Sequence, residues 1–86
     1  MNKTFSIASV DLFKICNEIE FCKREYDGYE PYIFMSENTL SAIESATDDV
    51  DFLDPAPIIS KGINATYSGY KMFINNDLQF GIVEIR

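Results

Sequence analysis

The chain has 86 residues, of which 47% are hydrophobic and 14% aromatic, and its formal net charge is −7. This length supports a single core over residues 1–86, because domains usually have about 100–150 residues. The hydrophobic content excludes a disordered chain, and no apolar run approaches the roughly 18 residues that a membrane span needs.

The first quarter of the chain predicts a short strand followed by a helix. Phe5 and Ile7 alternate with polar or small residues, which is the pattern of a half-buried strand. Apolar residues then recur at helical spacing and predict a helix over residues 10–25, with Ser9 as its N-cap. The start of the chain lacks the continuous apolar run of a signal peptide, so we expect a soluble, cytoplasmic protein.

The next segment predicts a second strand and a second helix. Gly28 and Pro31 end the first helix, since glycine suits a helix end and proline disfavours helical geometry in the residue before it. The apolar run 32–35 predicts a buried strand. Ser36 then predicts the N-cap of a helix over residues 37–47.

The last part of the chain predicts an acidic loop over residues 48–57 and then strands. Residues 63–67 and 70–74 flank Ser68-Gly69, a two-residue step that suits a tight hairpin, and residues 80–85 predict the last strand. The expected fold class is α+β, with two helices packed on one face of a small, mostly antiparallel sheet that ends in a C-terminal β-meander.

The chain offers few groups for catalysis. It has no His, which removes the usual general base and the commonest metal ligand. Cys16 and Cys22 lie on the first predicted helix about 120° apart around its axis, so we expect two reduced thiols. Asp49 and Asp51 invite comparison with an EF-hand loop, but Asp54 stands where that loop requires glycine. We therefore expect no enzymatic activity, no metal and no cofactor.

Charge is distributed unevenly along the chain. No Lys or Arg occurs between Glu25 and Ser60, and such an acidic field repels nucleic acid and anionic membranes while favouring a basic protein surface. Tyrosines alternate with carboxylates just after the first helix, and tyrosine is enriched at interfaces. Tyr26 and Tyr29 suit an interface or a core cap equally, whereas Tyr32 is expected in the core. The predicted partner-binding residues are Glu25, Tyr26, Asp27, Tyr29, Glu30, Asp48, Asp49, Asp51 and Asp54.

Two stretches carry a resemblance. Residues 32–43, with the sequence YIFMSENTLSAI, resemble the strand and Ser-capped helix of small bacteriophage proteins. Residues 69–81, with the sequence GYKMFINNDLQFG, are similar to a hairpin of the same kind of protein. The resemblance implies a phage or mobile-element origin and supplies no catalytic residues.

These patterns favour a non-catalytic, acidic interaction protein. Its middle region would dock on the basic nucleic-acid-binding face of a host or phage protein and block it, as a partial DNA mimic of the anti-defence type acting in the host cytoplasm. The alternative is a structural accessory protein of a virion that self-associates through strand edges or the tyrosine-bearing turn.

Overall fold

A computed structural model describes residues 4–25, 30–47 and 57–86, and within these ranges it contains two helices and six strands. This is the expected α+β class. None of the described helices is long and apolar enough to cross a membrane. The elements are β1 (Phe5–Ala8), α1 (Leu12–Arg24), β2 (Ile33–Met35), α2 (Glu37–Thr47), β3 (Ile59–Ser60), β4 (Thr66–Tyr67), β5 (Tyr70–Ile74) and β6 (Ile82–Ile85).

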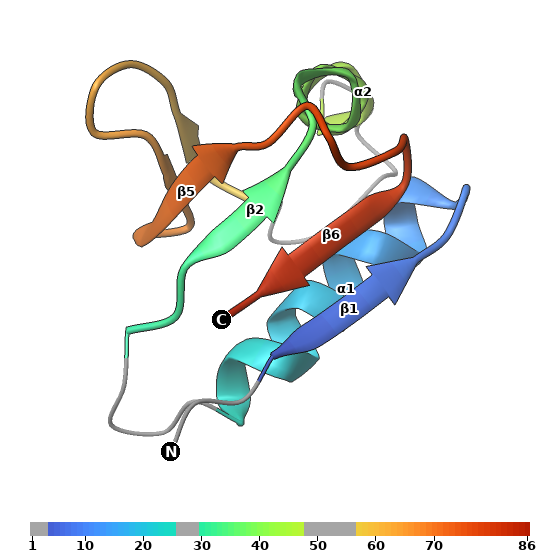
Figure 1. Ribbon diagram of the computed structural model, residues 1–86, viewed down its shortest axis with the longest axis horizontal. Helices are drawn as coiled ribbons and strands as arrows, with labels where there is room; N and C mark the ends of the chain where they lie inside the picture. The colour runs from blue at the N-terminus through green and yellow to red at the C-terminus, as the bar shows by residue number, and fades with distance from the viewer. Residues whose placement is uncertain (1–3, 26–29, 48–56) are drawn as a thin grey trace.

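The strands form one sheet in the order β1-β6-β2-β5-β4-β3 (Figure 1). All neighbouring strands in this order are antiparallel except β2 and β5, which are parallel. Strands β3, β4 and β5 form an antiparallel meander, whereas the expected meander joined residues 63–67, 70–74 and 80–85. The chain then crosses over β2, so that β6 lies between β1 and β2 rather than beside β5. The last strand of the chain therefore pairs with the first two, β1 and β2.

The helix α1 begins two residues later than the sequence predicts. Asp11, rather than Ser9, is its N-cap, and Asp11 Oδ1 accepts hydrogen bonds from the backbone N–H groups of Phe13 at 3.0 Å and Lys14 at 3.4 Å. Ser9 Oγ instead accepts a hydrogen bond from the Asp11 N–H. A carboxylate satisfies the free N–H groups of the first turn and also complements the helix dipole, which explains why the cap falls on Asp11.

The helix α2 has the predicted bounds, and the N-cap role expected of Ser36 is confirmed. Ser36 Oγ accepts a hydrogen bond from the Thr39 N–H at 3.3 Å. The two side-chain hydroxyls also lie 2.9 Å apart, and both residues are buried. Thr39 Oγ1 in turn accepts a hydrogen bond from the Gly81 N–H at 3.1 Å. This buried network joins the start of α2 to the turn that leads into β6.

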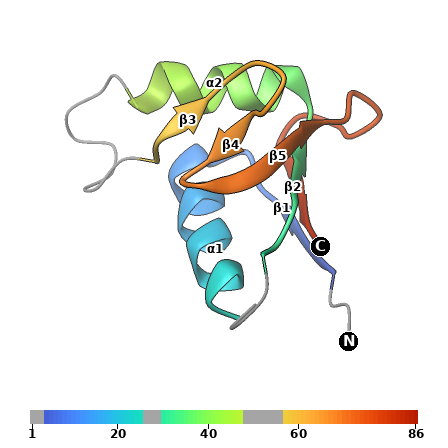
Figure 2. The ribbon, with the colours of Figure 1, turned by 90° about the vertical axis from the view of Figure 1, so that its left-hand side faces the viewer.

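Both helices cover the same face of the sheet and leave the other face open (Figure 2). Side chains alternate in direction along each strand, so that Ile33 and Met35 of β2 point into the core while Phe34 points to the open face. The core beneath the sheet consists of Ile7, Ile15, Cys16, Ile19, Cys22, Ile33, Met35, Leu40, Ile43, Tyr67, Met72, Val83 and Ile85.

The hairpin between β4 and β5 has the predicted two-residue turn. Ser68 and Gly69 both have positive φ angles, of 48° and 86°. This is the turn geometry that matches the twist of the flanking strands, and glycine adopts it without steric cost. The turn directs β5 back along β4 and then onto β2.

Candidate functional site

Seven of the nine residues of the site predicted from sequence lie outside the described residues. Glu25 and Glu30 are described. Glu25 is the exposed C-cap residue of α1, and Glu30 is an exposed residue shortly before β2. Neither forms an ion pair with another described residue. The structure does not describe Tyr26, Asp27, Tyr29, Asp48, Asp49, Asp51 and Asp54.

The acidic stretch is partly compensated in space. Lys61 follows the base-free stretch in sequence, yet its ammonium group lies 2.8 Å from Glu44 Oε1 on α2. The two groups are close enough for an ion pair, but their geometry is not that of a hydrogen bond, because Glu44 Oε1 has no hydrogen-bond partner among the described residues. The charge pattern along the sequence therefore exaggerates the negative charge near α2, because it does not show that Lys61 lies beside Glu44.

Three aromatic side chains gather on the open face of the sheet instead. Phe34 of β2 and Phe73 of β5 occupy the same rung of the parallel pair, and their rings stack with centroids 5.4 Å apart. Tyr32, just before β2, meets Phe73 edge-on at 5.7 Å. Tyr32 and Phe73 remain 44% and 45% exposed, so the expectation that Tyr32 lies in the core is wrong. The alternation of side chains along β2 puts residues 32 and 34 on the open face together.

Two cations border these rings. The Arg86 guanidinium lies 4.3 Å from the centroid of Phe34 and forms a 2.9 Å ion pair with Glu84. The Lys71 ammonium lies 5.9 Å from the centroid of Tyr32. Because β6 and β5 flank β2, Phe34 lies between Arg86 on one side and Phe73 on the other. Arg86 and Phe73 thus both occupy space around the ring of Phe34, which disfavours the stacking of a nucleobase on it.

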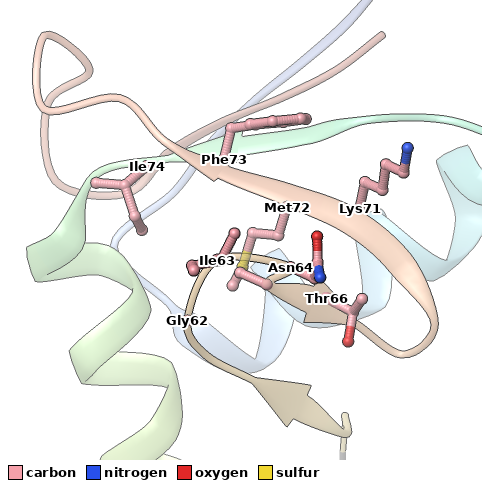
Figure 3. A pocket seen from close by; sticks show the side chains of 9 residues that line it. Gly62, Ile63, Asn64, Thr66, Lys71, Met72, Phe73 and Ile74 are labelled. Atoms are coloured by element: carbon pink, nitrogen blue, oxygen red, sulfur yellow. The ribbon is translucent and has the colours of Figure 1, made fainter.

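A groove lies on the other side of β5 from the ring cluster (Figure 3). It has a volume of about 460 Å³ and lies between β5 and the segment of residues 62–66. A smaller hollow of about 150 Å³ shares Met72 and Ile74 with it and reaches Leu40 on α2. Ile63 is fully exposed and Ile74 is 44% exposed beside this groove. Phe73 and Lys71 border both the groove and the open sheet face.

The aromatic cluster on the open face and the groove on the other side of β5 meet at Phe73, which borders both, and together we call them the β5 surface. It is defined by Tyr32, Phe34, Ile63, Phe73 and Ile74. Adjoining exposed apolar side chains are uncommon on monomeric proteins and mark sites of association, whereas scattered ones carry no such meaning. Aromatic residues also contribute most to the binding energy of protein interfaces. The geometry therefore suits the binding of a protein surface.

The nucleophilic side chains are buried in the core, away from this surface. Burial is the main cause that raises the pKa of the Cys16 thiol, and it also raises the pKa of Cys22, with further contributions from Glu18 and Glu25. Burial likewise raises the pKa of Tyr67 far above its ordinary value, with a smaller contribution from neighbouring Cys16. The Tyr67 hydroxyl lies close enough to the Cys16 thiol to influence its pKa, but it makes no hydrogen bond of good geometry with a described residue. Protonated buried thiols are poor nucleophiles.

No three Cys, Asp or Glu side chains of the described ranges converge on a point where a metal could bind. Comparisons with protein families, with curated protein sequences and with solved structures found no match. The candidate site therefore rests on the geometry of this chain. Tyr32 and Phe34 were missed because the run 32–35 is apolar throughout and predicted a buried strand.

Proposed function

We propose that the protein is a non-catalytic interaction protein that binds another protein through the β5 surface. The observation that carries this proposal is the aromatic cluster of Tyr32, Phe34 and Phe73, which is held in fixed mutual geometry on a sheet face that neither helix covers. Rings that are already ordered lose little conformational entropy on binding, so they favour a tight contact. The rim residues Lys71, Glu84 and Arg86 supply polar contacts around the apolar centre, as in many interfaces.

The charge of the chain favours a basic partner. The net charge of −7 attracts a positively charged protein and raises the rate of encounter, while it opposes nucleic acid. In the specific form of this proposal the protein is a phage-encoded inhibitor in the host cytoplasm. It covers the basic nucleic-acid-binding face of its target, and its acidic residues take the place of phosphates.

A second candidate function is that of an assembly protein whose partner is another copy of the same chain. The observation that favours it is the open edge of the sheet at β1, where the described chain places no further strand. In this case the acidic charge serves solubility rather than recognition.

The test is affinity capture from a host lysate at low and high salt, with the bound proteins quantified by mass spectrometry. Three forms of the chain are compared: the natural sequence, the double variant Tyr32→Ser/Phe73→Ser, and Phe21→Ser. Phe21 is the matched control, because it is an exposed aromatic residue, at 62%, on α1 rather than on the β5 surface.

The proposal predicts a basic protein that the natural sequence and Phe21→Ser retain at low salt and that the double variant loses. Release at high salt identifies the electrostatic contribution, since salt screens exposed charges over a Debye length of about 8 Å at physiological strength. Equal capture by all three forms would contradict a role for the β5 surface. Charge reversal of Asp48, Asp49, Asp51 and Asp54 tests the inhibitor form separately, because it reverses the charge of that segment and leaves the three rings unchanged.

A further inference from the structure

The edge of the sheet at β1 has the features of a surface that pairs with a second copy of the chain. β1 is the outermost strand next to β6, and no described segment lies beyond it (Figure 1). The opposite edge, β3, has two residues, whereas β1 has four. Each added rung contributes main-chain hydrogen bonds, so β1 is the better template for a further strand.

The register of β1 shows which backbone groups face outward. The Ser9 N–H donates to the Gly81 carbonyl at 3.0 Å, so residues 5, 7 and 9 direct their N–H and C=O groups toward β6. Directions alternate along a strand, and therefore the N–H and C=O groups of Ser6 and Ala8 point to the open edge. Neither residue has a hydrogen-bond partner there among the described residues.

Within its described residues, this edge lacks the usual protection against pairing. Edge strands of monomeric proteins commonly carry a charged residue, a proline or a bulge that prevents the addition of another strand. β1 has the sequence FSIA and contains neither a charged residue nor a proline. Its pairing with β6 is continuous over all four residues, so it contains no bulge. Ser6 and Ala8 are exposed and small, so a neighbouring backbone can approach closely. Val10, just beyond the strand, is an apolar side chain with 88% exposure.

We infer that two copies of the chain pair antiparallel through β1, about a twofold axis at Ile7. In this register Ser6 of one copy lies opposite Ala8 of the other, and the relation holds twice by symmetry. Each Ser6 and Ala8 pair exchanges both N–H···O=C bonds, because these are the residues whose groups point outward. The two sheets then form one continuous sheet, and the open faces with their β5 surfaces stay free for a partner.

The interface is isologous, so it closes as a dimer and does not extend into a filament. Its pairing uses β1 alone, and the residues that carry the proposed function lie on β2, β5 and the segment before β4. The inference deepens the second candidate function, and it is independent of partner binding through the β5 surface, so either can fail while the other holds.

The test is a charge swap at the two facing positions, read by sedimentation equilibrium from about 10 µM to about 1 mM, the range of weak interfaces. The variant Ser6→Lys/Ala8→Lys places Lys opposite Lys twice, and the variant Ser6→Lys/Ala8→Glu places Lys opposite Glu twice. Both introduce two long charged side chains at the same exposed positions, so they match in bulk and in their effect on the monomer fold, which circular dichroism checks.

The inference predicts that the natural chain dimerises, that the Lys/Lys variant is weakened about tenfold or more, and that the Lys/Glu variant dimerises as well as the natural chain or better. Three results would overturn it: a natural chain that stays monomeric over the whole range, a Lys/Lys variant that dimerises like the natural chain, or a Lys/Glu variant as weak as the Lys/Lys variant. The last result would exclude this register specifically.

Discussion

The ring of Phe34 is stacked against the ring of Phe73 with an interplanar angle of 22°, on two strands that pair in parallel only because the chain crosses over between them. Neither residue is next to the other in sequence, and both are on the open face of the sheet. Together with Tyr32 they form the centre of the β5 surface, and their arrangement connects the topology of the sheet to the proposed function.

The contact between the two rings can be measured by a double-mutant cycle. The variants Phe34→Ala, Phe73→Ala and their combination should show a coupling free energy of about 0.5–1.5 kcal/mol, the range of stacked aromatic pairs. Urea unfolding followed by circular dichroism gives the free energy of unfolding of the natural chain and of the three variants. Additive single effects would mean that the rings do not interact in solution.

Gly81 should tolerate no side chain. Its φ angle is +83°, and a Cβ atom there would lie 2.2 Å from the backbone oxygen of Ser9. We expect Gly81→Ala to lower the free energy of unfolding by about 2 kcal/mol or more. The backbone strain of alanine at a positive φ adds to the clash with Ser9 at the β1–β6 junction. Gly62→Ala is the control, since Gly62 also has positive φ but an added Cβ meets no atom within 4 Å. Equal losses in the two variants would show that the clash is relieved by a backbone shift.

Tyr67→Phe should leave stability unchanged or raise it by up to about 1 kcal/mol, because the buried hydroxyl has lost its hydrogen bonds to water and gained none from a described residue. The aromatic ring keeps its place in the core. Chemical unfolding of the two proteins measures the difference. A loss of more than about 1 kcal/mol would reveal a hydrogen bond that the hydroxyl makes in solution.

The buried thiols predict a loss of stability in alkaline solution. The pKa values of Cys16 and Cys22 are raised above the usual value of 9.0 in the folded protein. Below that pH both states hold the thiol protons, so stability does not depend on them. As pH rises above about 9, thiols of the unfolded chain ionise first and the free energy of unfolding falls.

Urea unfolding at pH 7, 8.5 and 9.5 checks this dependence, and the double variant Cys16→Ala/Cys22→Ala is its control. The variant should be less stable at every pH but should show a smaller decline between pH 8.5 and 9.5. A thiol reagent at pH 8 should also react slowly with the folded protein and rapidly in urea. Fast reaction in the folded state would place at least one thiol at the surface.

Much of the fold could be predicted because its elements have local signals. Ser36 caps α2 through side-chain hydrogen bonds within one turn, and Ser68-Gly69 is a turn whose geometry depends on its own two residues. The strand order could not be predicted in the same way. The insertion of β6 between β1 and β2 depends on long-range pairing, such as the hydrogen bonds between Tyr32 and Arg86, which leave no mark in the neighbouring sequence.

The candidate site was hidden for a related reason. An apolar run such as residues 32–35 has the same composition whether a strand is covered on one face or on both. Only the pairing of β2 with β5 and β6 and the position of both helices on one side show that Phe34 is open. Of the nine residues predicted to bind a partner, seven lie outside the described part of the chain, and their role stays a prediction.

The central claim is that a protein partner binds the β5 surface, and the most direct measurement is an NMR titration of isotopically labelled chain with the protein recovered by affinity capture. The account predicts that backbone amide shifts concentrate in β2, β5 and residues 62–66, and that Tyr32→Ser/Phe73→Ser abolishes them. Shifts confined to α1, or to the acidic segments with β2 and β5 unperturbed, would contradict it.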